Sequence, residues 1–213
     1  MGETLRTFGV WFQEHMVPTL LMRKLTFQLV CALDFAHESN VIHTDIKPDN
    51  VFIKFRDTHR IKSEYLPVAL RAPEVLIRAP WDISVDWWNL GATVFEVYRA
   101  MRLFDGAVPP DGHSEVREHL AEIVDIFGPF PRALLEKGDA TVQAMFDDEG
   151  RIKDAEPMGR PPLESEAFLP GLDQTTKEVF GSFLRAMMKI NPAERPTPEE
   201  LAKHPWLDPK SKW

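Results

Sequence analysis

The residues from Val85 to Tyr98 constrain the fold more than any other part of the chain. They are apolar on nearly every side of a helix, and they include two adjacent tryptophans, Trp87 and Trp88. A helix that is hydrophobic all round is stable only in the interior of a protein. The segment therefore predicts a core helix surrounded by other elements. A chain of 213 residues with 44% hydrophobic content is long enough to supply them.

The longest surrounding helix is expected between Thr19, which suits an N-cap, and His37. Apolar residues recur there at helical spacing and predict one buried face, formed by Leu25, Leu29, Ala32, Leu33 and Ala36. Cys31 lies within the same apolar pattern, so we expect it to be a small core residue.

Shorter elements complete the predicted fold. Helices are expected over residues 114–126 and 176–188, and after Thr197, whose following proline suits a first helical turn. Residues 51–54 predict a short strand. The expected fold class is therefore mainly α, with a few short strands.

The composition excludes several classes of function. A net charge of −8 argues against direct nucleic-acid binding, which needs clustered lysine and arginine, and favours basic partners. No apolar run approaches the roughly 20 residues that span a bilayer, and no secretory pattern begins the chain. The one cysteine cannot form an intramolecular disulfide, and the seven histidines show no zinc-binding spacing. We expect a protein of the cytoplasm, the nucleus or both, without a membrane partner.

Residues 43–50 read His-Thr-Asp-Ile-Lys-Pro-Asp-Asn and match the pattern H-x-D-x-K-x-x-N. In this pattern a carboxylate accepts a hydroxyl proton, an ammonium group offsets phosphate charge, and an amide oxygen holds Mg²⁺. We therefore expect Asp45 and Lys47 to be catalytic, and Asn50 to bind the metal of a magnesium nucleotide. His43 is interpreted as a structural anchor of the loop, because Asp45 already supplies a base.

Three further motifs follow in order. Ala-Pro-Glu occupies residues 72–74, Asp-Trp-Trp-Asn-Leu-Gly occupies residues 86–91, and Arg195 lies within Asn-Pro-Ala-Glu-Arg-Pro. A buried Glu74 would need a partner, and the planar guanidinium of Arg195 suits a carboxylate well. Asp86 is expected to accept hydrogen bonds from the backbone of residues 43–50 and so to fix Asp45.

Together the four motifs resemble the C-terminal lobe of eukaryotic serine/threonine protein kinases. The resemblance implies phosphorylation of protein serine or threonine with ATP and Mg²⁺, by a domain over residues 1–207 with a tail at 208–213. Thr44, where most kinases have arginine, Arg71 before Ala-Pro-Glu, and a group-specific insert at about 105–170 resemble the SR-protein kinases. That narrower resemblance implies a basic, arginine- and serine-rich protein substrate.

Within the insert, four acidic residues fall on one face of the expected helix: Glu115, Glu118, Glu122 and Asp125. This acidic face is a candidate docking surface for an arginine-rich substrate. The alternative is a solvated helix face whose first glutamates suit the positive end of the helix dipole.

The sequence also lacks parts that phosphoryl transfer needs. Only 21 residues separate Asn50 from Ala72, and none is glycine, so no D-x-G metal motif lies there. Asp57 is the one aspartate in this interval and is interpreted as a loop residue, and a deletion near Leu66 and Pro67 is the simplest explanation. Nothing before Thr19 matches the glycine-rich loop or the strand lysine of the small lobe.

Three functions remain open from the sequence. The first is a serine/threonine kinase represented by an incomplete and poorly active chain, and the second is a pseudokinase that serves as a scaffold. The third is a small-molecule phosphotransferase, a class that shares H-x-D-x-x-x-x-N. Lys47, the Ala-Pro-Glu motif and Arg195 favour the protein kinases over this third class.

Overall fold

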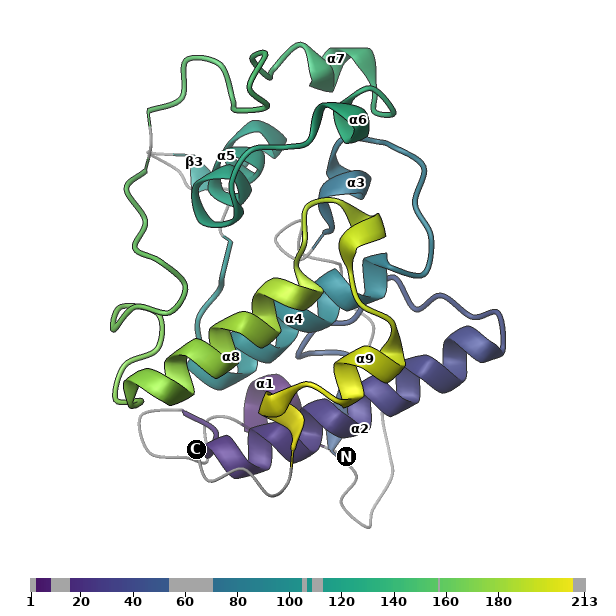
Figure 1. The fold of residues 1–213 in the computed structure, drawn as a ribbon, viewed down its shortest axis with the longest axis vertical. Helices are drawn as coiled ribbons and strands as arrows, with labels where there is room; N and C mark the ends of the chain where they lie inside the picture. Colours follow the sequence, from purple (N-terminus) through teal and green to yellow (C-terminus); the bar gives the residue numbers. More distant parts are fainter. Residues whose placement is uncertain are drawn as a thin grey trace.

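The computed structural model describes residues 3–8, 16–53, 71–104, 107–108, 113–156 and 158–208. Helices dominate this part of the chain, as predicted (Figure 1). The α-helices are α1 (Leu5–Phe8), α2 (Thr19–Glu38), α3 (Pro73–Leu76), α4 (Val85–Arg99), α5 (Val116–Phe127), α6 (Arg132–Leu135), α7 (Ala140–Gln143), α8 (Gln174–Met187) and α9 (Pro198–Ala202). Two short 3₁₀ helices follow α8: η4 (Pro192–Glu194) and η5 (Pro205–Leu207).

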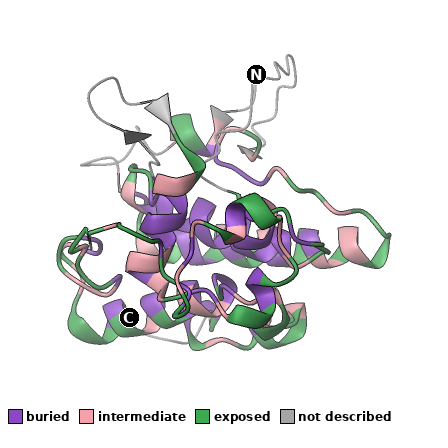
Figure 2. Ribbon diagram, turned by 90° about the horizontal axis from the view of Figure 1, so that it is seen from above, coloured by how far each residue is buried: buried purple, intermediate pink, exposed green. Residues whose placement is uncertain are grey.

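Helix α4 forms the centre of the core. Every residue from Val85 to Tyr98 is buried, which confirms the prediction of an interior helix. Helix α8 runs alongside α4, and α2 packs against α4 as well (Figure 1). The buried residues concentrate in these central helices, whereas the outer turns are mostly exposed (Figure 2).

Aromatic contacts join the C-terminal elements to the core helix. Tyr98 of α4 packs edge-on against Phe180 of α8, with ring centroids 5.1 Å apart. Phe180 in turn stacks on Trp206 of η5 at 4.3 Å. Because each of these side chains removes a large apolar area from water, the last helices are part of the same core as α4.

The predicted long helix is confirmed as α2, but its buried face differs from the expected one. Leu33 is buried as expected, Leu25, Leu29 and Ala36 are only partly buried, and Ala32 is exposed. The residues that are fully buried are Met22, Arg23, Thr26, Val30 and Leu33.

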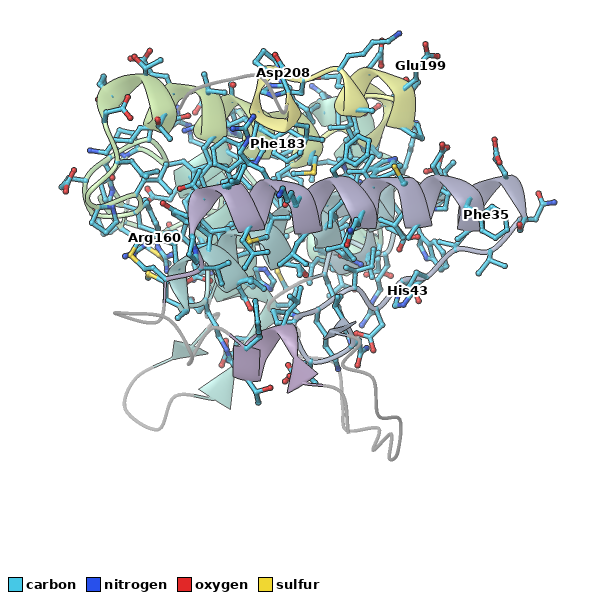
Figure 3. The ribbon with its side chains drawn as sticks, turned by 90° about the horizontal axis from the view of Figure 1, so that it is seen from below. Phe35, His43, Arg160, Phe183, Glu199 and Asp208 are labelled. Carbon is cyan, nitrogen blue, oxygen red and sulfur yellow. The ribbon has the colours of Figure 1, made fainter. Side chains whose placement is uncertain are left out.

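Cys31 is exposed, so the prediction of a core cysteine is wrong. The physical reason is the burial of Arg23, whose Nε donates to the carbonyl of Trp206 at 2.6 Å. This contact turns the face carrying Arg23 toward η5 and α9, and the face carrying Cys31 and Phe35 toward solvent. Phe35 is 71% exposed and lies near the end of α2 (Figure 3). A hydrophobic pattern alone does not reveal that an arginine is buried.

The helix predicted in the insert is α5, but its acidic face is not a continuous exposed surface. Glu122 is 3% exposed and forms an ion pair with Arg160. Asp125 accepts a hydrogen bond from the backbone amide of Arg160 at 2.8 Å, and Glu118 pairs with Arg117 at 3.2 Å. Of the four acidic residues, only Glu115 is exposed. The predicted docking stripe is therefore wrong at Glu122, because Arg160 covers this side of the helix.

The strands are very short. β1 (Glu3–Thr4) pairs antiparallel with β2 (Phe52–Ile53), and β3 (Ala107–Val108) pairs antiparallel with β4 (His113–Ser114). β2 lies inside the predicted strand at 51–54. The amide of Leu5 also donates to the carbonyl of Val51 at 2.8 Å, which places α1 beside the end of the 43–50 loop. Among the residues described, no helix has the length and apolar character of a membrane span.

The last predicted helix is α9, and its start is well defined. Thr197 accepts a hydrogen bond from the amide of Glu200, whose side chain accepts one from the amide of Thr197. This capping box satisfies two backbone donors that a helix N-terminus otherwise leaves free. Pro198 occupies the first turn, as the sequence predicts.

Candidate active site

The loop at residues 43–50 brings its predicted catalytic side chains together. The ammonium group of Lys47 lies 3.6 Å from Asp45 Oδ2, and the Asn50 amide donates to the same oxygen at 2.6 Å. Asn50 also donates to the Asp45 carbonyl at 3.0 Å. The Lys47 side chain is 3% exposed and that of Asp45 is 28% exposed. A buried ammonium group thus lies beside a partly exposed carboxylate, of which the Oδ1 atom is itself buried.

Asp86, at the start of α4, fixes the backbone of this loop. Its two carboxylate oxygens accept hydrogen bonds from the amides of His43 at 2.8 Å and Thr44 at 2.7 Å. Thr44 has a positive φ of 60°, which is uncommon outside glycine. The hydrogen bond that the Thr44 amide donates to Asp86 therefore helps to hold a backbone conformation that is locally unfavourable.

The ring of His43 has a smaller part in this arrangement than its position suggests. His43 is exposed, on the opposite side of α2 from Glu199 of α9 (Figure 3). Its Nδ1 accepts from the Asp45 amide at 3.3 Å, and its own backbone amide makes the bond to Asp86. The main chain of His43, more than its ring, connects the loop to the core.

Three residues that sequence reasoning missed complete the support of the loop. Asn89 Nδ2 donates to the Thr44 carbonyl at 3.1 Å, and Thr93 Oγ1 donates to the Ile46 carbonyl at 3.0 Å. His37, in the last turn of α2, contacts Asp86 Oδ2 through Nε2 at 2.9 Å. A signal for two of them exists in the sequence, because residues 86, 89 and 93 lie on one polar stripe of a largely apolar helix.

The Glu74–Arg195 ion pair lies beside the start of α4. Arg195 donates through two nitrogens to the two oxygens of Glu74, at 2.6 and 2.8 Å, and both side chains are fully buried. Nη1 also donates to the carbonyl of Ser84 at 2.8 Å, and Nε donates to the carbonyl of Lys189 at 3.0 Å. The guanidinium also lies over the Trp88 ring, 5.5 Å from its centroid. The pair therefore joins α3, the start of α4 and the end of α8.

The described residues do not form a complete magnesium site. Asn50 offers an amide oxygen, and Asp45 Oδ1 accepts no hydrogen bond from any described residue. Mg²⁺ is usually held by one or two carboxylates together with phosphate oxygens and water. Within the described ranges, no group of three or more histidine, cysteine or acidic side chains has an arrangement that could hold a metal ion. Asp57 and the expected deletion near Leu66 and Pro67 lie outside those ranges.

An acidic group that the motifs do not include lies close to the loop. Glu96 of α4 is 6% exposed, and burial raises its pKa to about 7, against the opposing effects of Arg6, Arg102 and the Leu103 amide. Arg6 lies 3.9 Å from Glu96 and 2.8 Å from Asp49, the neighbour of Asn50. The net charge close to the loop therefore depends on the protonation of Glu96 as well as on the carboxylate of Asp45.

A family model described as the protein kinase domain matches residues 3–207 of this chain. The chain belongs to the protein kinase family. It is 29% identical to a serine/threonine protein kinase of Aspergillus fumigatus, over 96% of this chain and 62% of the relative. It is 27% identical to the DYRK-family kinase pom1 of Schizosaccharomyces pombe, over 91% of this chain and 19% of that kinase.

The fold agrees with this assignment. A crystal structure of a kinase domain matches 98% of this chain with a TM-score of 0.74, at 22% sequence identity and over 71% of the matched chain. The chain spans less than two thirds of the length of the two curated relatives named above. The Aspergillus alignment extends over 248 residues although this chain has 213, so that relative has residues within the matched region that lack a counterpart here.

The buried ion pair predicts a large and specific loss of stability. Arg195→Ala leaves Glu74 as a buried charge without its partner, and we expect a loss of about 3–5 kcal/mol in the free energy of unfolding. The control is Arg132→Ala, which breaks the exposed pair with Glu136 and should cost less than about 1 kcal/mol. Urea unfolding followed by circular dichroism measures both. Equal losses in the two variants would contradict a structural role for the pair.

The raised pKa of Glu96 predicts a pH dependence of stability. Its pKa is about 7 when folded and 4.5 as a reference, so the stability from its protonated form is present below pH 4.5 and lost as the pH rises through 7. The total loss is on the order of 3 kcal/mol. In Glu96→Gln the loss between pH 4.5 and 7 should disappear, as judged by urea unfolding across this range. Parallel curves for wild type and variant would show that Glu96 ionises normally.

Proposed function

We propose that this chain forms part of an enzyme that phosphorylates serine or threonine in protein substrates with ATP. The observation that carries the proposal is the juxtaposition of Asp45, Lys47 and Asn50 on a loop anchored to the core by Asp86. Family membership supports the reaction type. The geometry supports the assignment of roles within it.

Asp45 is the proposed general base. Its Oδ2 is engaged by Asn50, while its Oδ1 has no hydrogen-bond donor among the described residues. A carboxylate oxygen without a donor is unfavourable unless a ligand supplies one. A substrate hydroxyl would donate to this oxygen, and its proton would pass to Asp45 as the hydroxyl oxygen bonds to the γ-phosphorus of ATP. The bond from the γ-phosphorus to the bridging oxygen breaks, and ADP leaves.

Lys47 is proposed to stabilise the negative charge of the transferred phosphoryl group. Its ammonium group is almost fully shielded from water, where electrostatic interactions are stronger than in solvent. Asn50 would contribute an amide oxygen to the magnesium ion that accompanies ATP. The carboxylate that such an ion also requires is not among the described residues, so no step is assigned to the metal.

A pseudokinase scaffold is the second candidate, and a specific observation favours it. The interval between Asn50 and Ala72 contains no glycine and hence no D-x-G motif. Without a second metal-binding acid, charge neutralisation at the phosphates is weakened. The two candidates differ in whether the protein encoded by the complete transcript transfers phosphate.

The finer part of the proposal is a basic substrate of the arginine- and serine-rich kind. A hollow of about 520 Å³ lies beside α5 and is lined by acidic residues that include Asp125, Asp147, Asp154 and Glu156. Arg151 and Lys153 also line it, and the chain as a whole has a net charge of −8. An acidic hollow at the insert would attract arginine side chains. It replaces the α5 stripe as the docking surface, because Glu122 is buried.

Asp45→Asn is expected to abolish phosphoryl transfer in protein made from the complete transcript. The amide cannot accept the hydroxyl proton, and a loss of about a hundredfold or more in kcat is expected. Transfer of radioactive phosphate from ATP to an arginine- and serine-rich peptide measures it. The control is Asp148→Asn, an exposed aspartate that lies far from the loop in the sequence.

Two outcomes would overturn the proposal. Transfer by the wild type that survives unchanged in Asp45→Asn would assign the base elsewhere. Absence of any transfer, combined with retained peptide binding, would favour the scaffold.

Charge reversal in the hollow should weaken binding of a basic peptide. Asp154→Lys combined with Glu156→Lys changes two exposed side chains, and we expect about a tenfold rise in Kd at low salt. The charge-matched control is Glu178→Lys combined with Glu199→Lys, which changes two exposed acids of α8 and α9 that do not line the hollow. Fluorescence anisotropy measures both. The same rise in the control would indicate a general charge effect and no docking site.

A further inference from the structure

A hollow with largely apolar walls lies between α2 and η5, and none of the four motifs contributes to it. It has a volume of about 470 Å³ and is lined by Leu20, Arg23, Lys24, Phe27, Gln28 and Leu207. All of these residues except Leu207 belong to the first half of α2, at positions that share one helix face. The hollow is termed the α2–η5 groove.

Two large apolar side chains of the groove are exposed to water. Leu20 is 58% exposed and Phe27 is 43% exposed, and they lie about two turns apart on the same face of α2. Leu207, which η5 contributes, is 6% exposed. Single exposed apolar residues are common, but several that gather in one hollow mark a surface that binds a partner.

The charges that line the groove are of one sign. Among its described lining residues two are cationic and none is acidic, in a chain with a net charge of −8. Arg23 is buried and donates to the backbone carbonyls of Trp206 and Asp208, so it holds η5 against α2. Lys24 is exposed, and no described carboxylate forms an ion pair with it. The side chain of Asp208, the acid that follows η5, does not line the groove.

The groove is separate from the catalytic loop. Helix α2 contacts η5 and α9, and His43 of the loop lies on the opposite side of α2 from Asp208 (Figure 3). A ligand in the groove would therefore leave Asp45 accessible to a substrate.

We propose that the α2–η5 groove is a docking site for a short acidic and apolar peptide segment of a partner protein. Leucine or phenylalanine side chains of this segment pack against Leu20, Phe27 and Leu207, and a neighbouring aspartate or glutamate pairs with Lys24. A second copy of this chain is a poorer occupant, because a twofold interface would bring the two copies of Lys24 toward each other. Docking at this groove does not require phosphoryl transfer.

Selection of random displayed peptides on the full chain tests this assignment. We expect the recovered peptides to share leucine or phenylalanine beside aspartate or glutamate. The Kd of one recovered peptide, labelled with fluorescein, is then measured by fluorescence anisotropy. Phe27→Ser should raise this Kd about tenfold or more, because apolar contact is lost. Lys24→Glu should raise it about tenfold at low salt and less at high salt, because salt screens the charge of an exposed lysine.

Two control variants change the same kinds of side chain outside the groove. Phe35→Ser removes an exposed phenylalanine near the other end of α2, and Lys137→Glu reverses an exposed lysine that does not line the groove. Both should change the Kd by less than about twofold. All four positions are exposed, so each variant should keep the fold, which circular dichroism checks.

Several results would overturn the docking site. Recovery of basic peptides or of none would do so, as would unchanged binding in Lys24→Glu or an equal loss of affinity in Phe27→Ser and Phe35→Ser. A wild-type dimer in sedimentation velocity that becomes a monomer in Phe27→Ser would assign the groove to a second copy instead. Because binding is measured without ATP, absence of phosphoryl transfer would refute the proposed function alone.

Discussion

The buried carboxylate of Asp86, at the start of α4, connects the core helix to the loop that carries the proposed catalytic residues. Asp86 belongs to the helix around which the other elements pack, and it accepts the backbone amides of His43 and Thr44. A loop is normally among the more mobile parts of a fold. Here its backbone is tied to a fully buried helix segment, so the placement of Asp45 depends on the packing of α4.

The second buried carboxylate has a structural task of the same kind. Glu74 and Arg195 are far apart in the sequence and fully shielded from water, and each of the three guanidinium nitrogens donates to an acceptor. Buried ion pairs are weak evidence for stability, but one held by several further hydrogen bonds specifies how the elements around it meet. This pair holds α3 against the start of α4 and the end of α8, while Asp86 holds the loop against the start of α4. Both constraints therefore act through the same helix.

The helices and motifs were largely predictable, because each depends on residues that are close in sequence. The apolar segment that became α4 and the capping signal at Thr197 are local features, and the structure contains both. The errors concern which face of a helix is covered. Cys31 and Glu122 are both on amphipathic helices, yet one is exposed and the other buried. Their environments depend on Arg23 and Arg160, which pair with distant parts of the chain.

The sequence by itself determined the mainly helical fold, the central helix, and the types of residue available at the loop. These follow from hydrophobic periodicity and from fixed spacings, which are properties of neighbouring residues. Only the tertiary structure decided that His37, Asn89 and Thr93 support the loop, and that Glu96 keeps its proton to a pH of about 7. Hydrogen bonding and desolvation in a core depend on which segments meet in space, and the order of residues along the chain does not encode these contacts in any local pattern.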